Sequence, residues 1–260
     1  MAGHFSSFPD DLTVLIQGAS RGLGLALTEL ALDDERVGIV VATSRHPDNS
    51  SGLSSLKDQH GDRLRTMALD VSDLDSIKEG AENFGELDKP LHLLINVAGV
   101  LHDSDRGMQP EKKIDELDPE NAIYSFRVNA LGPLLMAQQF VPFLDPQRSV
   151  IANLSARVGS ISANELGGWY SYRASKAAQN MFTRTLSIEL GRYRKSHQAI
   201  CVGLHPGTVK TDLSAPFRSN VKHEIFSPEK AARQLLEVID GLDETHQGQF
   251  IVYNGEPIDY

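Results

Sequence analysis

Two tyrosines and a lysine lie close together in the segment GGWYSYRASKAAQN, Gly167 to Asn180. On a helix, residues four apart share a face; Tyr172 and Lys176 have that spacing, whereas Tyr170 has Ala174 at the same offset. A phenol ionises near pH ~10, and a close cation lowers its pKa by about 1–3 units. The pair is therefore a candidate proton donor near neutral pH, although an exposed helix with an incidental tyrosine would have the same spacing.

The composition is that of a globular protein, with 40% hydrophobic and 23% charged residues among 260. The net charge of −10 argues against a nucleic-acid partner, and no apolar run approaches the ~20 residues of a membrane helix, so we expect no membrane insertion. The nine histidines lack metal-ligand spacing, so we expect no metal. The single cysteine, Cys201, allows no intramolecular disulfide, and no signal peptide is visible, which fits a cytoplasmic protein.

Short apolar runs alternate with segments of helical periodicity along the whole chain. The predicted strands are Leu12–Gln17, Val37–Thr43, Arg63–Leu69, Leu91–Val97, Ser149–Ser155, Ala199–His205 and Gln249–Tyr253. The predicted helices are Gly22–Leu32, Asp73–Phe84, Glu120–Val141, Tyr170–Arg194 and Pro228–Ile239. This alternation predicts one α/β domain over residues 1–260, a doubly wound parallel sheet of about seven strands with helices on both faces. We expect residues 1–10 to form a flexible amino-terminal tail.

Three long connections follow the predicted fourth, fifth and sixth strands, at residues 99–120, 156–169 and 206–228. Ligands of open parallel sheets bind at the carboxyl edge of the strands, where all three connections begin. We therefore expect a substrate pocket there. At the same edge, Gly18, Gly22 and Gly24 form a turn between the first strand and the first helix, which would let backbone N–H groups approach a pyrophosphate.

Six motifs resemble the short-chain dehydrogenase/reductase superfamily over nearly the whole chain. They are GASRGLG (Gly18–Gly24), LDVSD (Leu69–Asp73), NVAG (Asn96–Gly99), RVNALGP around Asn129, YRASK (Tyr172–Lys176) and HPGTVKTD (His205–Asp212). The segments GGWYSYRASKAAQNMF and NLSARVGSI further resemble the subgroup of C-factor proteins and sniffer-type carbonyl reductases. The resemblance implies a Rossmann-like fold, a nicotinamide dinucleotide cofactor and a homodimer or homotetramer.

The resemblance also implies which residues contact the cofactor. Those expected around it are Gly18, Ser20, Arg21, Gly22, Leu23 and Gly24 at the pyrophosphate, Asp70 and Val71 at the adenine, Asn96, Ala98 and Gly99 at the ribose, and Pro206, Gly207, Val209, Thr211, Tyr172 and Lys176 towards the nicotinamide. An acid at the end of the second strand would bind the 2′-hydroxyl of NAD, but Ser44 and Arg45 stand there. Two guanidiniums, Arg21 and Arg45, suit a 2′-phosphate, so we predict NADP(H) over NAD(H) unless they point to solvent.

By resemblance, NADPH delivers hydride to the carbonyl carbon of an aldehyde, ketone or quinone, and Tyr172 protonates the oxygen. Lys176 would hold the nicotinamide ribose and lower the pKa of Tyr172, and Asn129 would anchor a water on the proton path. The same residues could oxidise an alcohol. A serine normally orients the carbonyl.

The expected serine position is occupied by Ala156 when the segment NLSARVG is aligned on Gly159. Ser155 is the first candidate to substitute for it, although it could instead cap or pair locally, and Ser160, further into the loop, is the second. The departure at Ala156 leaves a second function open, a regulatory or signalling protein that binds NAD(P) with weak or no turnover. Intact Asn129, Tyr172 and Lys176 favour the enzyme.

Overall fold

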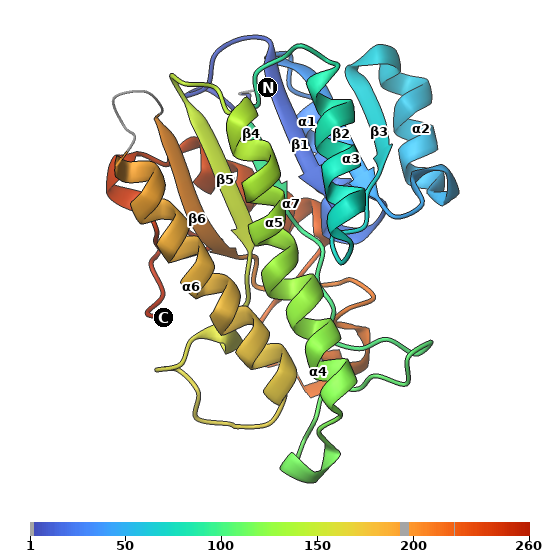
Figure 1. Cartoon of the computed structure of the whole chain (residues 1–260), viewed down its shortest axis with the longest axis vertical. Helices are drawn as coiled ribbons and strands as arrows, with labels where there is room; N and C mark the ends of the chain where they lie inside the picture. Colours follow the sequence, from blue (N-terminus) through green and yellow to red (C-terminus); the bar gives the residue numbers. More distant parts are fainter. Residues whose placement is uncertain (1–2, 193–197, 221) are drawn as a thin grey trace.

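The chain folds around a parallel sheet of seven strands in the order β3-β2-β1-β4-β5-β6-β9, here described from a computed structural model that covers residues 3–192, 198–220 and 222–260 (Figure 1). The strands are β1 (Leu12–Gln17), β2 (Val37–Ser44), β3 (Leu64–Ala68), β4 (Leu93–Asn96), β5 (Ser149–Leu154), β6 (Ala199–His205) and β9 (Phe250–Val252). The order reverses between β1 and β4, as in Rossmann-like sheets, and ligands bind at such a switch point. The predicted fold class is confirmed.

Helices cover both faces of the sheet (Figure 1). One face carries α1 (Gly22–Leu32), α2 (Ser51–His60) and α7 (Pro228–Asp240), and the other carries α3 (Leu74–Gly85), α5 (Gly132–Phe140) and α6 (Tyr170–Arg192). In β1, Val14 and Ile16 enter the core on the first face and Leu15 enters the core on the second. A strand that is covered on both sides can therefore be apolar at every position.

The sequence did not predict three local features. The helix expected over Glu120–Val141 is divided into α4 (Pro119–Phe126) and α5 by a π-helical segment, Arg127–Leu131. Helix α2 begins at an N-cap, Ser50, whose hydroxyl accepts a hydrogen bond from Leu53 N, and it has too few apolar residues to show a clear period. A small parallel sheet pairs β7 (Thr208–Val209) with β8 (Ile225–Phe226) within the third long connection. The last two residues of the predicted helix Tyr170–Arg194 lie outside the described residues.

The amino-terminal segment packs against the domain, which corrects the expectation of a flexible tail over residues 1–10. Phe5 and Phe8 are buried in the core, with their rings 5.9 Å apart in an edge-to-face arrangement. Ser6 Oγ donates to a carboxylate oxygen of Asp240 at 2.6 Å, and Ser7 N donates to the other at 2.8 Å. The apolar pair supplies the burial that holds this segment in place; residues 1 and 2 lie outside the described part of the chain.

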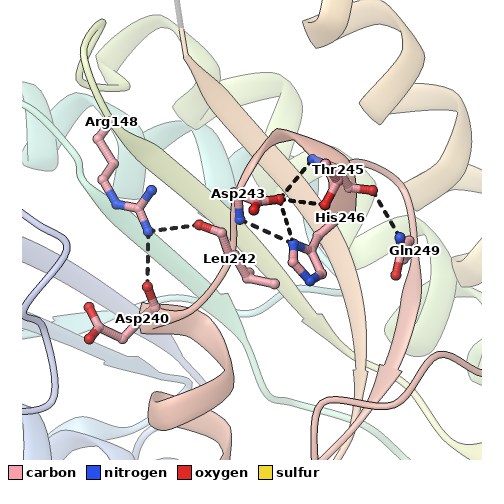
Figure 2. A network of polar contacts seen from close by, with 7 residues as sticks. All are labelled: Arg148, Asp240, Leu242, Asp243, Thr245, His246 and Gln249. Atoms are coloured by element: carbon pink, nitrogen blue, oxygen red, sulfur yellow. Dashed lines mark hydrogen bonds and ion pairs between the residues drawn. The ribbon is translucent and has the colours of Figure 1, made fainter.

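Arg148 joins the start of β5 to the carboxyl end of α7 (Figure 2). Its guanidinium donates to the carbonyl oxygens of Asp240 and Leu242, at 3.3 and 3.1 Å. A cation suits this position because the last carbonyls of a helix have no partner within the helix. Asp243 then caps the following short turn through hydrogen bonds with Thr245 and His246. This network lies at the amino ends of the strands, away from the long connections, which all follow carboxyl ends.

Candidate active site

The glycine turn forms a close-packed cradle between β1 and α1. Gly18 has a φ of +87°, and a Cβ there would lie 2.7 Å from Ala98 N, so only glycine fits. A Cβ on Gly22 would lie 3.1 Å from the methyl group of Thr211, which places the connection after β6 directly against the turn. Gly24 packs on the carbonyl oxygen of Gly18. Five residues expected at the cofactor are thus brought together from the connections after β1, β4 and β6.

The end of β2 differs in part from the expectation for a phosphate site. Ser44 is buried and its hydroxyl has no partner among the described residues, so it is available to a bound group. Arg45 is exposed and is paired with no described carboxylate. Arg21, however, forms an ion pair with Asp212 at 3.3 Å, and both side chains are exposed. Among the described residues, Arg45 therefore has no acidic partner and remains available to a phosphate, whereas Arg21 is paired with Asp212.

Asp70, Val71 and Asn96 line the same edge of the sheet. Asp70 Oδ1 accepts hydrogen bonds from the backbone N and the hydroxyl of Ser72, at 2.8 and 2.7 Å, which fixes the carboxylate. Asn96 donates to Asn153 Oδ1 at 2.8 Å and so joins β4 to β5, while its own Oδ1 is buried without a partner in the described chain. Of the remaining expected contacts, Ser20 accepts from Ser50 through its carbonyl at 2.7 Å, Leu23 and Val209 are buried, and Pro206 and Gly207 turn the chain after β6.

Tyr172 and Lys176 are both buried in α6, 7% and 3% exposed. Lys176 Nζ donates to Leu154 O at 2.8 Å and to Gln179 Oε1 at 2.9 Å. Burial lowers the pKa of Lys176 to about 7 and raises the pKa of Tyr172 to about 12. The expected lowering of the phenol pKa by Lys176 is therefore absent here: desolvation dominates, and the phenol is held in the protonated form that a proton donor needs.

Asn129 lies in the π-helical segment and is fully buried. Its side chain accepts from Val100 N at 2.7 Å and donates to Val100 O at 2.8 Å, which fixes the backbone directly after Gly99. A Cβ on Gly99 would lie 3.3 Å from Asn129 Oδ1 and 3.6 Å from Lys176 Nζ. The chain after β4 thus passes between Asn129 and Lys176. Such π-helical insertions occur often at functional sites.

Neither candidate serine is directed to Tyr172. Ser155 Oγ donates to Asn180 Oδ1 at 2.6 Å, and Ser160 Oγ donates to Asp259 O at 2.6 Å. Both hydroxyls thus pair with residues distant along the chain, 25 positions away for Ser155 and 99 positions away for Ser160. Ala156, at the expected serine position, contributes no hydroxyl. The structure therefore gives no support to Ser155 or Ser160 as the group that orients a carbonyl.

An aromatic cluster lies beside Tyr172. The Trp169 ring is 6.2 Å from the Tyr172 ring and 5.0 Å from Phe217, and Phe217 is 5.9 Å from the His102 ring, centroid to centroid. These residues come from the connections after β5, β6 and β4, which meet at the lower edge of the sheet in Figure 1. The expectation that the three connections share one location is met. The shared location of the three connections was predicted from the sequence, whereas the part that His102 plays in this cluster was not.

Two further polar residues escaped the sequence analysis. Glu111 is buried and binds the first turn of α6 through Ser171. Gln179, also buried, accepts the hydrogen bond from Lys176 and leaves its own Nε2 unpartnered among the described residues. The only signal for Gln179 was its position three residues after Lys176 on one helix.

Within the described residues, no three His, Cys, Asp or Glu side chains meet as a metal site, and no helix has the length and apolar content to cross a membrane.

Comparison with known proteins agrees with this geometry. The chain is 35% identical over 170 residues to C-signal from Myxococcus xanthus, an alignment that covers 65% of this chain and 92% of that protein. An NADPH-bound carbonyl reductase from chicken fatty liver is 30% identical, with a TM-score of 0.84 and coverage of 97% and 96%. Carbonyl reductase Sniffer of D. melanogaster is 26% identical, with a TM-score of 0.82 and coverage of 96% and 100%. A family model for the short chain dehydrogenases matches residues 12–222, and the chain therefore belongs to that family of oxidoreductases.

Proposed function

We propose that the chain is an NADPH-dependent carbonyl reductase acting on an aldehyde, ketone or quinone, with Tyr172 as general acid. The observation that carries this proposal is the placement of Asn129 and Lys176 against Gly99, with Tyr172 buried one helical turn before Lys176 in α6, at the sheet edge that also carries the glycine cradle. The NADPH-bound carbonyl reductase that the chain resembles supports the choice of reaction.

The cofactor would supply the hydride, and the chain's own residues would position it and handle the proton. The glycine turn around Gly18 and Gly22 would suit a pyrophosphate, because it leads into the start of α1, where backbone N–H groups without helical partners favour an anion. Tyr172, kept protonated by burial, donates its proton to the carbonyl oxygen. Lys176, once charged, stabilises the phenolate that remains. Asn129 holds the backbone at Val100 and so keeps Gly99 against Lys176.

The reaction is tested by replacing the phenol. Tyr172→Phe should lower kcat for NADPH oxidation by about 10²–10⁴-fold, because general acid catalysis contributes about that much. Tyr170→Phe is the matched control, since Tyr170 lies in the same turn of α6 and is exposed. Both are assayed by NADPH absorbance with aldehydes, ketones and quinones. A Tyr172→Phe enzyme as active as the Tyr170→Phe control would contradict the assignment.

NADPH preference is proposed from the end of β2, where an acid is absent, Ser44 has a free hydroxyl and Arg45 is an unpaired cation. A guanidinium against a phosphate dianion gives a charge-assisted hydrogen bond. Arg45→Ala should weaken NADPH binding about tenfold and leave NADH binding unchanged, measured by titration. Equal affinities of the wild type for NADPH and NADH would refute the preference.

Ala156 favours a second candidate, a regulatory or signalling protein that binds NADPH and seldom turns over. The hydrogen bonds of Ser155 to Asn180 and of Ser160 to Asp259 support this candidate, because both hydroxyls are engaged by the chain itself. The resemblance to C-signal is compatible with this role. Tight NADPH binding without reduction of any compound in the carbonyl panel would favour this candidate over the enzyme.

We also propose self-association as a homodimer or homotetramer. The support is a group of exposed apolar side chains along α4, the π-helical segment and α6, namely Ile123, Phe126, Leu131, Met181 and Ile188. Light scattering of the purified protein tests this, and a monomer at micromolar concentration contradicts it.

Cys201, the only cysteine, is buried in β6, which fits the cytoplasm as the proposed location.

A further inference from the structure

Glu111, in the connection after β4, places a buried carboxylate at the start of α6. Its side chain is 5% exposed, and Oε2 accepts a hydrogen bond from Ser171 N at 3.2 Å. Ser171 Oγ donates to Oε1. No ion pair joins Glu111 to another described residue. The free N–H groups of a first helical turn favour a negative charge, so this carboxylate stabilises the turn that carries Tyr172.

The backbone of Glu111 holds the residue that precedes this turn. Trp169 N donates to Glu111 O at 2.5 Å. Gly167, Gly168 and Trp169 have successive φ values of +65°, +65° and +51°. A left-handed tryptophan is an outlier that persists only when its surroundings hold it. On the other side, Arg173 donates from its backbone to Trp169 O at 2.8 Å and from Nε to Gly168 O at 3.0 Å.

The consequence of this turn is the position of one indole ring. Held at this φ, Trp169 meets the Tyr172 ring edge-to-face at 6.2 Å and the Phe217 ring at 5.0 Å. An aromatic surface of this kind favours flat apolar groups in offset or edge-to-face contact. This aromatic surface lies beside the ring of Tyr172, whose hydroxyl is proposed to protonate the substrate.

Glu111 is also linked to the opposite side of the site. The carbonyl of Ser171 accepts from Ser125 Oγ at 3.4 Å, and Ser125 Oγ in turn accepts from Asn129 Nδ2 at 3.2 Å. The carboxylate, the first turn of α6 and the π-helical segment therefore form one chain of buried polar contacts. The carboxylate ties Glu111 to Ser171, and the backbone carbonyl of the same residue accepts from Trp169 N. Loss of the carboxylate therefore frees the backbone that holds Trp169.

We propose that Glu111 is a positioning residue that fixes Trp169 against Tyr172, and that the resulting wall selects carbonyl compounds bearing an aryl group. The proposal rests on the proposed reductase function for its substrate class. The fixing of Trp169 by Glu111 is independent of turnover.

The sequence contains a single tryptophan, so intrinsic fluorescence reports on Trp169 alone. Glu111→Ala should shift its emission to longer wavelength and raise its acrylamide quenching constant at least twofold. Glu111→Gln keeps one acceptor oxygen and should show less than half of that change. Glu165→Gln, in the same connection as Trp169 and exposed, is the matched control and should match the wild type. Emission and quenching of Glu111→Ala equal to the control would overturn the proposal.

Ser171→Ala removes the hydroxyl donor to Glu111 Oε1 and leaves the backbone donor to Oε2 in place. It serves as a second variant if Glu111→Ala does not fold. Its Trp169 emission should shift in the same direction as that of Glu111→Ala. An unchanged emission, in a variant whose far-UV circular dichroism spectrum is that of the folded protein, would count against the positioning role of Glu111. The NADPH dissociation constant, measured by titration, should stay within twofold of the wild type for each variant, because neither side chain lies at the cradle.

Kinetics test the substrate class with an aryl ketone and a short aliphatic aldehyde. Glu111→Ala should raise KM for the aryl ketone about tenfold, because a displaced Trp169 ring no longer makes its aromatic contact with the aryl group, and KM for the aliphatic aldehyde less than twofold. kcat should change little for both. An equal loss with both substrates, or a loss confined to kcat, refutes the role in selection. A wild type that reduces neither compound refutes the reductase proposal, while the fluorescence result still decides the role of Glu111.

Discussion

Below pH 7, the cofactor-free protein should be less stable than the same fold without the buried charge of Lys176. Its ammonium is 3% exposed, and burial lowers its pKa from 10.5 to about 7. The unfolded chain therefore binds more protons than the folded chain between pH 7 and pH 10.5, so stability rises with pH across that window. Below pH 7 the lysine is charged in both states and the whole cost of burying the charge is present.

The magnitude follows from the pKa difference. At about 1.4 kcal/mol per unit, a depression from 10.5 to about 7 corresponds to a cost of about 5 kcal/mol at low pH. About 4 kcal/mol of this falls between pH 6 and pH 10. Replacement by methionine, of similar length and without a charge, removes the titration. It also removes the hydrogen bonds to Leu154 and Gln179, a loss that does not depend on pH.

Urea unfolding of wild type and Lys176→Met, each at pH 6 and pH 10, measures the effect. The free energy of unfolding of the variant minus that of the wild type should be about 4 kcal/mol larger at pH 6 than at pH 10. Other groups that titrate, including Tyr172 and Cys201, are common to both proteins and cancel in this double difference. If the two differences agree within about 1 kcal/mol, Lys176 keeps its ordinary pKa in the fold and the reasoning from burial is refuted.

Three further changes test other parts of the structure. Phe5→Ala should lower the free energy of unfolding by about 3–5 kcal/mol, because it empties a fully buried ring site; a loss below about 1 kcal/mol in urea would mean that the segment is detached in solution. Asp212→Asn frees Arg21 from its ion pair and should tighten NADPH binding by about two- to fivefold, whereas an unchanged titration would place Arg21 away from the phosphate. Ala156→Ser restores a hydroxyl at the expected position and should raise kcat about tenfold or more; a kcat at or below that of the wild type would show that this chain uses another donor.

The sequence predicted the sheet well because buried parallel strands leave a strong signal. All seven strands were predicted near their observed bounds, since runs such as LTVLIQ are apolar throughout. Helix α2 was missed because it buries only Leu53 and Leu56. The π-helical segment was missed because a wider helical turn requires no distinctive residue type. The packing of the amino-terminal segment was missed because its hydrogen-bond partner, Asp240, lies far along the chain.

The site was predictable as a set of residues but less so in its contacts. Spacing placed Tyr172 and Lys176 on one helix, yet it gave the wrong sign for the phenol pKa, because burial is a property of the folded environment. The pairing of Arg21 with Asp212 and of Ser155 with Asn180 joins residues far apart in sequence. Glu111 carried no signal, because a lone acid in a polar connection is not distinctive.

The two ends of the chain lie in different surroundings, and this matters for how the protein is handled. The amino end packs near Asp240, on the side of the sheet away from the long connections (Figure 1). The carboxyl end runs beside the connection after β5, where Ser160 contacts Asp259 and Ser162 contacts Tyr260. An affinity tag or a fluorescent fusion at the amino end would therefore project away from the long connections. One at the carboxyl end would lie against the connection after β5 and should disturb the proposed active site.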